Sequence, residues 1–147
     1  MFLSESIKMS GKVKVQTFES GDLINEINFP NIITTVGKGY IASRIANSSL
    51  AVMSHMAIGS SQSIQTLNDT LVIQETLRSS FFSIVVTASE IEYVALFTPP
   101  VGSSRSISEA GILNAASAGT LLCRTTFPPI TQTTSQTIAI TWVVSVG

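Results

Sequence analysis

Residues Arg105–Gly147 read RSISEAGILNAASAGTLLCRTTFPPITQTTSQTIAITWVVSVG, and this stretch decides the fold class. Apolar and polar residues alternate along Ser106–Leu113, Thr120–Phe127 and Thr137–Val146. Alternation with a period of two is typical of half-buried strands, because successive side chains face opposite ways. Gly119 supplies a turn between the first two segments. The stretch therefore predicts three consecutive β-strands.

The last of these strands has two rows of side chains, and no residue from Thr125 to Gly147 is charged. The apolar row is predicted to lie in the core; it consists of Ile138, Ile140, Trp142, Val144 and Val146. The opposite row contains Thr141 and Val143 and lacks the charged residues that usually protect an exposed strand. We expect a partner or another sheet to cover this second row.

The same alternation extends upstream. Val13 and Val15 alternate with polar neighbours, and Gly21-Asp22 turns the chain into a second strand over Leu23–Ile33. Pro30 lacks a backbone donor, so this strand should end near Phe29 or lie on a sheet edge. Further strands are predicted over residues 50–59, 82–86 and 91–97, listed here in chain order.

One segment has helical spacing. Val36 pairs with Tyr40 and Ile41 with Ile45 at i,i+4, which predicts a helix over Thr35–Asn47 with Thr34 or Thr35 as its cap. Residues 60–65 read as a polar loop, and residues 69–77 as a short helical or irregular crossing. Eight or nine strands with one short helix near residues 35–47 indicate a mainly β protein, a two-sheet β-sandwich or jelly roll.

The chain has 147 residues, the size of one ordinary domain, and we expect residues 1–147 to form one. Residues 1–11 are predicted to form an extended arm that reaches a neighbour, with a frayed terminus as the alternative. Charged residues make up 12% of the chain, about half the usual share. This low charge suggests that neighbouring molecules cover much of the surface; the alternative is a neutral, Ser/Thr-rich β-protein with nothing bound.

The composition also argues against nucleic acid and a membrane as partners. The eight Lys and Arg residues are scattered and the net charge is −1, so no basic stripe for nucleic acid is expected. No stretch approaches the ~20 apolar residues of a membrane-spanning helix, and the first ten residues lack the apolar core of a signal peptide. We therefore expect folding in a cytoplasm and no membrane partner.

Residues that could carry chemistry are isolated. His55 is the only histidine and Cys123 the only cysteine, so a typical four-ligand zinc site is not expected. Glu90 and Glu92 share a strand face and read as solvated, and Gly37–Gly39 lacks the spacing of a phosphate loop. We predict no catalytic residue, metal ligand or cofactor, and a protein that is not an enzyme. The competing class is an enzyme or small-ligand binder hidden in a β-sandwich.

Glu109 differs from the other acidic residues because it lies inside a predicted apolar strand. It should share one face with Ile107 and Gly111, where a carboxylate is costly unless it is paired. Arg124 and Arg78 are the candidate partners. Gly111 would allow a close backbone approach or a bulge. We interpret Glu109, Gly111 and Arg124 as fold-defining residues.

The order of these segments resembles a recurring pattern of tailed-bacteriophage virion proteins. The pattern contains Glu109-Ala-Gly-Ile-Leu-Asn114, a glycine-containing turn, Leu121-Leu-Cys-Arg124, Phe127-Pro-Pro-Ile130 and a final Thr/Ile/Trp strand. Upstream, His55-Met-Ala-Ile-Gly59 and the stretch from Asn68 to Arg78 follow in the same order. The resemblance therefore covers the chain from about Ile32 to Gly147.

The resemblance implies two settings, small stand-alone virion proteins and the amino-terminal attachment module of tail fibres. No fibre repeat follows Gly147 here, which favours a capsid cement or decoration subunit that clamps neighbouring major capsid proteins. The alternative is a tail, baseplate or tail-fibre attachment protein.

The expected location is the capsid surface of the virion, after synthesis in the host cytoplasm. The expected partners are the major capsid protein and further copies of this chain, as a trimer or dimer with the trimer preferred. The candidate contact residues are Phe127, Pro128, Pro129, Ile130, Thr141 and Val143.

Overall fold

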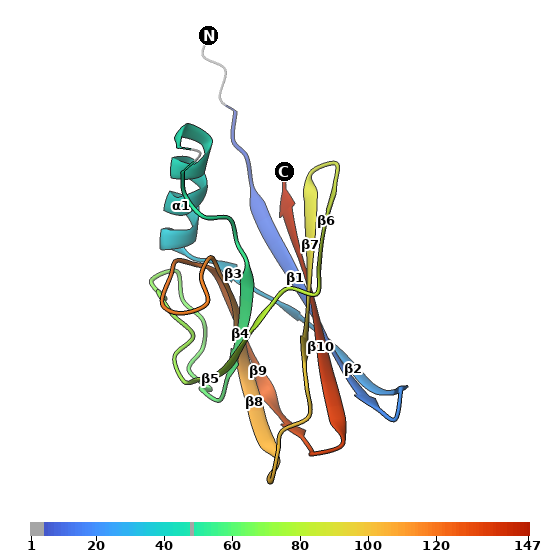
Figure 1. Cartoon of the computed structure of the whole chain (residues 1–147). Helices are drawn as coiled ribbons and strands as arrows, with labels where there is room; N and C mark the ends of the chain where they lie inside the picture. Colours follow the sequence, from blue (N-terminus) through green and yellow to red (C-terminus); the bar gives the residue numbers. More distant parts are fainter. Residues whose placement is uncertain (1–4, 48) are drawn as a thin grey trace.

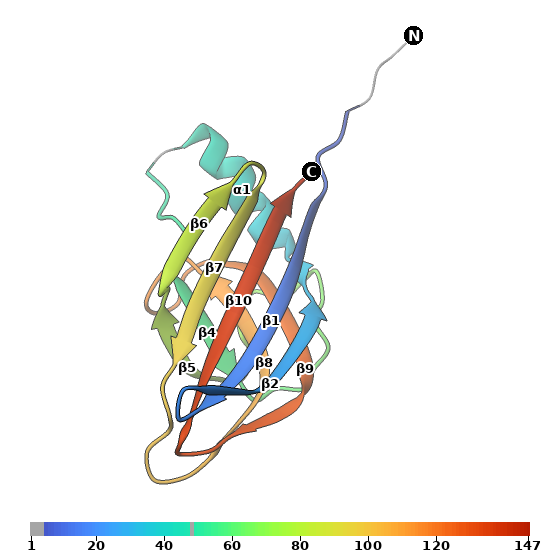
Figure 2. The same cartoon turned by 90° about the vertical axis from the view of Figure 1, so that its right-hand side faces the viewer.

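The computed structural model of the protein describes residues 5–47 and 49–147. Within them, ten strands form two antiparallel five-stranded sheets packed face to face, and one helix lies beside the sheets (Figure 1). The front sheet, which faces the viewer in Figure 2, has the order β2(Asp22–Pro30), β1(Met9–Glu19), β10(Gln136–Val146), β7(Glu90–Phe97), β6(Ser83–Thr87). The back sheet has the order β3(Ile32–Ile33), β9(Leu121–Gln132), β8(Arg105–Leu113), β4(His55–Gly59), β5(Glu75–Ser80). The prediction of a mainly β two-sheet sandwich is confirmed.

The predicted hairpin near the start of the chain is present as β1 and β2. Its turn is formed by Ser20 and Gly21, both at positive φ. The strand predicted over Leu23–Ile33 is divided after Pro30, because Ile32–Ile33 leaves the front sheet and pairs with β9 of the back sheet. Of the predicted arm, Met9–Gly11 belongs to β1, Glu5–Lys8 has no regular structure, and residues 1–4 lie outside the described residues.

The predicted helix is α1(Thr35–Ala46). The Thr34 hydroxyl accepts a 3.0 Å hydrogen bond from the Gly37 amide, and Asn47 forms the C-cap. A Cβ at Gly37 would lie 2.2 Å from the Leu122 carbonyl oxygen, so the glycine lets the helix pack directly on β9. The conformational cost of a glycine in the first turn is therefore offset by close packing.

Three further strand boundaries differ by more than one residue from the sequence prediction. The strand predicted over residues 50–59 begins only at His55, and the crossing predicted over 69–77 is irregular until β5 begins at Glu75. β9 continues beyond Phe127 to Gln132, past two prolines. The register between β8 and β9 shifts beside these prolines, which supply no backbone donor and so tolerate an interrupted ladder.

The main core lies between the two sheets. The predicted apolar row of β10 lies in it, since Ile138, Ile140, Trp142 and Val144 are at most 1% exposed. Val146, at the end of the row, is 36% exposed. At this end the front sheet extends beyond the back sheet, and α1 is the element opposite it (Figures 1 and 2). We call this part of the sandwich the open end.

Candidate functional site

A buried cluster of charges links two strands of the back sheet to the loop that contains Ser63 and Asp69. The side chain of Arg124, on β9, is fully buried, and its Nη2 atom lies 2.6 Å from Oε2 of Glu109, on β8. Its Nη1 atom lies 2.9 Å from Oδ2 of Asp69, and Nη2 also donates to the Ser63 carbonyl at 3.0 Å. The predicted Glu109–Arg124 pair is therefore present. Burial of these charges is tolerated because each one has partners.

Arg78, the other candidate partner of Glu109, has a different role. Its Nη2 atom lies 2.6 Å from Oε1 of Glu75, on the same strand. Its Nη1 atom donates to the carbonyls of Ala115 and Ala118 at 2.9 and 2.8 Å. Arg78 thus ties the edge of the back sheet to the β8–β9 turn and takes no part in the buried cluster.

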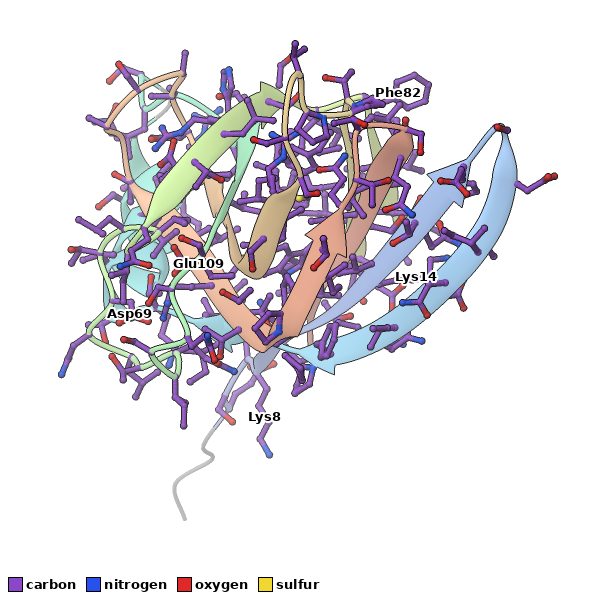
Figure 3. All side chains as sticks on the ribbon, turned by 90° about the horizontal axis from the view of Figure 1, so that it is seen from below. Lys8, Lys14, Asp69, Phe82 and Glu109 are labelled. Carbon is purple, nitrogen blue, oxygen red and sulfur yellow. The ribbon has the colours of Figure 1, made fainter. Side chains whose placement is uncertain are left out.

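The buried cluster fastens residues 60–74, which we call the covering loop, to the outer face of the back sheet. The Gln74 amide donates to Oε1 of Glu109 at 2.6 Å, and the Ser108 hydroxyl donates to the Ser61 carbonyl at 2.9 Å. Val72 of the loop is 3% exposed and packs in a small second core with Ala57, Leu113 and Leu121. In Figure 3, Glu109 and Asp69 lie beside this loop, away from Lys14 and Phe82.

A change of register in β8 places Glu109 on this outer face. The pairing with β9 shifts between Ile107 and Glu109, and Ile107 is part of the main core between the sheets. The expectation that Glu109 shares a face with Ile107 is therefore wrong. The irregularity between them breaks the alternation of side chains, so residues two apart no longer point to the same face. Gly111 does share the face of Glu109. A Cβ there would lie 2.8 Å from a methyl of Val72, which confirms the predicted close approach.

Asp69 is the member of the buried cluster that sequence reasoning missed. Partial burial tends to raise the pKa of its carboxyl group, but hydrogen bonds from the Thr66 amide, Arg124 and the Thr66 hydroxyl outweigh this and hold the pKa below its usual value. The Thr66 amide and hydroxyl lie 2.9 and 3.0 Å from the two carboxylate oxygens. This Thr-x-x-Asp turn was a readable local signal, but its long-range partner Arg124 was not.

The structure does not bring the isolated candidates for chemistry together into one site. Glu90 and Glu92 are exposed to solvent on the outer face of β7, as the sequence predicted. Nδ1 of half-buried His55 lies 2.8 Å from the Ser54 hydroxyl. Cys123 is buried, and desolvation raises the pKa of its thiol well above the usual value, which disfavours the reactive thiolate. Among the described residues, no three His, Cys, Asp or Glu side chains form a group that could hold a metal ion.

The candidate contact residues fall into two classes. Phe127 is 6% exposed and stacks on Phe29 with ring centroids 4.9 Å apart, so it is a core residue and is not available to a partner. Pro128 and Pro129 are exposed and Ile130 is half-buried. Thr141 and Val143 are half-buried on the outer face of the front sheet, which no described element covers in Figure 2. Their predicted role as contacts stays a prediction.

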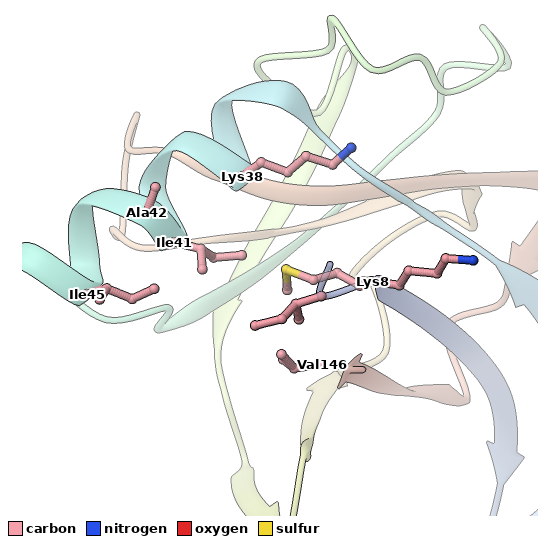
Figure 4. A pocket seen from close by; sticks show the side chains of 8 residues that line it. Lys8, Lys38, Ile41, Ala42, Ile45 and Val146 are labelled. Carbon is pink, nitrogen blue, oxygen red and sulfur yellow. The ribbon is translucent and has the colours of Figure 1, made fainter. Parts of the chain in front are cut away.

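Besides the exposed residues of β6 (Ile84, Val85 and Val86), two groups of exposed apolar side chains lie on separate parts of the molecule. The first is the loop surface, the outward side of the covering loop; it consists of Ile64, Leu67, Leu71 and Ile73. The second lies at the open end, where Ile7 and Ile45 are 73% and 85% exposed. A cleft of about 630 Å³ separates α1 from the ends of β1 and β10 there. In Figure 4, Ile41 and Ile45 line its helix side, and Val146 and Lys8 line its sheet side.

Comparison with family models, curated proteins and solved structures finds no match for this chain. Among the described residues, no helix has both the length and the apolar character needed to cross a membrane. The function must therefore be inferred from the surfaces described above and from the order of the sequence segments.

Proposed function

We propose that this protein is a structural subunit of a tailed-bacteriophage virion, namely a capsid cement or decoration subunit that clamps neighbouring major capsid proteins. The sequence support is the ordered resemblance from about Ile32 to Gly147 and the 12% share of charged residues. The structural support is the position of the exposed apolar side chains.

The observation that carries the proposal is the presence of two apolar surfaces on one sandwich. The loop surface lies outside the back sheet, and the open end lies where the front sheet and α1 separate (Figure 1). Large exposed apolar patches on soluble proteins commonly mark interaction sites. Two such sites on separate elements allow one subunit to contact two neighbours, which a clamp requires.

The buried cluster gives the loop surface a fixed shape. Residues 60–74 contain no helix or strand, and a loop of this length would lose conformational entropy if it became ordered only on binding. Here Arg124, Glu109 and Asp69 already hold the loop on the sheet. The residues that carry the resemblance thus act on binding indirectly, by ordering the surface that makes the contact.

A clamp of this kind needs only modest affinity at each contact. Once one surface is bound, the second binds at a high effective concentration, so two small interfaces act together. On a closed shell the same pair of contacts repeats at every subunit. The protein would therefore add strength to the shell without any covalent chemistry.

Protein quantification in purified virions tests the location. We expect a copy number comparable with that of the major capsid protein. A handful of copies per virion would contradict the cement assignment and favour the tail, baseplate or fibre-attachment alternative.

A matched pair of charge substitutions tests the surface. Leu71→Glu, at a position 52% exposed on the loop surface, should greatly reduce retention of the protein on virions while leaving its melting temperature unchanged. Val101→Glu is the control, because Val101 is 99% exposed in a loop outside both apolar surfaces. Equal retention of the two variants would contradict a binding role for the loop surface.

A further inference from the structure

Strand β6 is an unusual sheet edge. Among the described residues it pairs only with β7, so its other side is free for hydrogen bonding. Its sequence, Ser83-Ile-Val-Val-Thr87, contains no charge, proline or glycine. Ile84, Val85 and Val86 are 50%, 49% and 69% exposed. A free edge with this composition favours pairing with another strand.

The other three edges of the described sandwich are protected. β2 carries Asp22 and Glu26 and ends in a proline, and β5 carries the Glu75–Arg78 ion pair. β3 is two residues long. Charge, proline and short length are the features that block edge-to-edge pairing. The lack of all three on β6 is a local exception.

The direction of the free backbone groups follows from the β6–β7 turn. Ala88 and Ser89 connect the paired residues Thr87 and Glu90. A two-residue turn of this kind places a hydrogen-bonded pair at its base, and hydrogen-bonded and non-hydrogen-bonded pairs then alternate along the strands. The backbone groups of Val85 therefore point toward β7, whereas those of Ile84 and Val86 point to the free side.

The sequence of β6 is self-complementary about Val85. In an antiparallel pair of two copies centred there, Val85 faces Val85, Ile84 faces Val86, and Ser83 faces Thr87. This register brings the free backbone groups of Ile84 opposite those of Val86 in the other copy. It also places β-branched side chains opposite each other, a pairing that stabilises sheets. A two-fold axis requires a self-complementary patch of this kind.

We propose that two copies of this chain associate through β6 in an antiparallel arrangement, joining their front sheets into one continuous ten-stranded sheet. This partner is a second copy because the strand complements itself in sequence and in hydrogen-bonding pattern. The proposal does not rest on the virion assignment. It favours a dimer over the trimer that the sequence suggested, and it places the contact on β6 rather than on β10.

Disulfide trapping tests the register. Val85→Cys places two cysteines directly opposite each other as a non-hydrogen-bonded pair, whose Cα separation of about 4.5 Å suits a disulfide. Oxidation should convert most of this variant to a reducible covalent dimer. Thr87→Cys is the matched control, because Thr87 faces Ser83 of the other copy and not itself. Native Cys123 is buried and should not compete.

Light scattering across a concentration series tests the association itself. The unmodified protein should be a dimer, and Val86→Lys should be a folded monomer that still unfolds cooperatively. Ile24→Lys, at a position 51% exposed on the opposite edge strand β2, should stay dimeric. A monomeric parent protein, a dimer that survives Val86→Lys, or equal trapping by Val85→Cys and Thr87→Cys would overturn the proposal.

Discussion

Charged residues on the outer face of the back sheet include a buried pair, whereas those on the outer face of the front sheet are accessible to solvent. On the back sheet, Glu109 and Arg124 are fully buried beneath the covering loop, and each is hydrogen-bonded. On the front sheet, Lys12 and Glu92 flank Val143 in the register and remain exposed to solvent. Strands of similar alternating pattern thus support a buried ionic layer on one side and a solvated face on the other. The difference comes from what covers each face.

Breaking the ionic layer should have the largest effect on stability. Arg124→Met removes the shared partner of Glu109 and Asp69, and loss of one member of a buried pair costs about 3–5 kcal/mol. Urea unfolding should show that the free energy of unfolding decreases by this amount. Lys12→Met on the front sheet is the control and should change the free energy of unfolding by less than about 0.5 kcal/mol. Equal effects of the two variants would contradict the comparison.

A double-mutant cycle measures the pairing itself. The Glu109→Gln/Arg124→Met double variant should be less destabilised than the sum of the two single variants, because the second substitution removes a charge that the first left without its partner. Strict additivity would mean that the two side chains contribute independently.

Gly111 tests how closely the covering loop must approach the back sheet. Gly111→Ala should lower the free energy of unfolding by about 1–3 kcal/mol, because the added methyl group would lie 2.8 Å from both Val72 and Leu121. Gly39→Ala in α1 is the matched control. A Cβ at Gly39 meets no atom within 4 Å, and alanine favours a helix by about 1 kcal/mol over glycine. Destabilisation by both variants to the same extent would contradict the close-approach argument.

Acid should loosen the same layer through Asp69, with a smaller effect. The folded-state pKa of Asp69 lies below the ordinary value of 3.8, so its ionised form stabilises the fold above that pH. This contribution is lost as the pH falls through the folded-state pKa. Urea unfolding at a series of pH values should show a shallower acid decline for Asp69→Asn than for the parent protein. In the Arg124→Met background, Asp69→Asn should change the slope less, and an equal change would argue against coupling to Arg124.

Several features were predictable from the sequence because they depend on nearby residues. The rows of β10 follow from strict alternation, and α1 follows from i,i+4 pairs with a capping threonine. The Glu109–Arg124 pair was predictable because an acid inside an apolar strand needs a cation, and the following strand supplied one.

Other features needed the tertiary structure. The face of Glu109 depends on a register shift against β9, and the role of Asp69 depends on Arg124, which is 55 residues away in the chain. Phe127 looked like a contact residue in the sequence, but its ring stacks on Phe29 of the opposite sheet. Long-range contacts of this kind leave no fixed spacing in the sequence.

The sequence by itself determined most of the segments that form strands, where the one described helix begins and which charge needs a partner, because backbone geometry and the cost of burying charge act on every chain in the same way. The tertiary structure alone decided which strand faces are covered. The residues of β6 have the apolar, β-branched character of a core strand, yet they remain exposed because the front sheet extends past the back sheet at that edge. Burial depends on which surfaces meet in three dimensions, and the alternating pattern of a strand is the same whether or not its faces are covered.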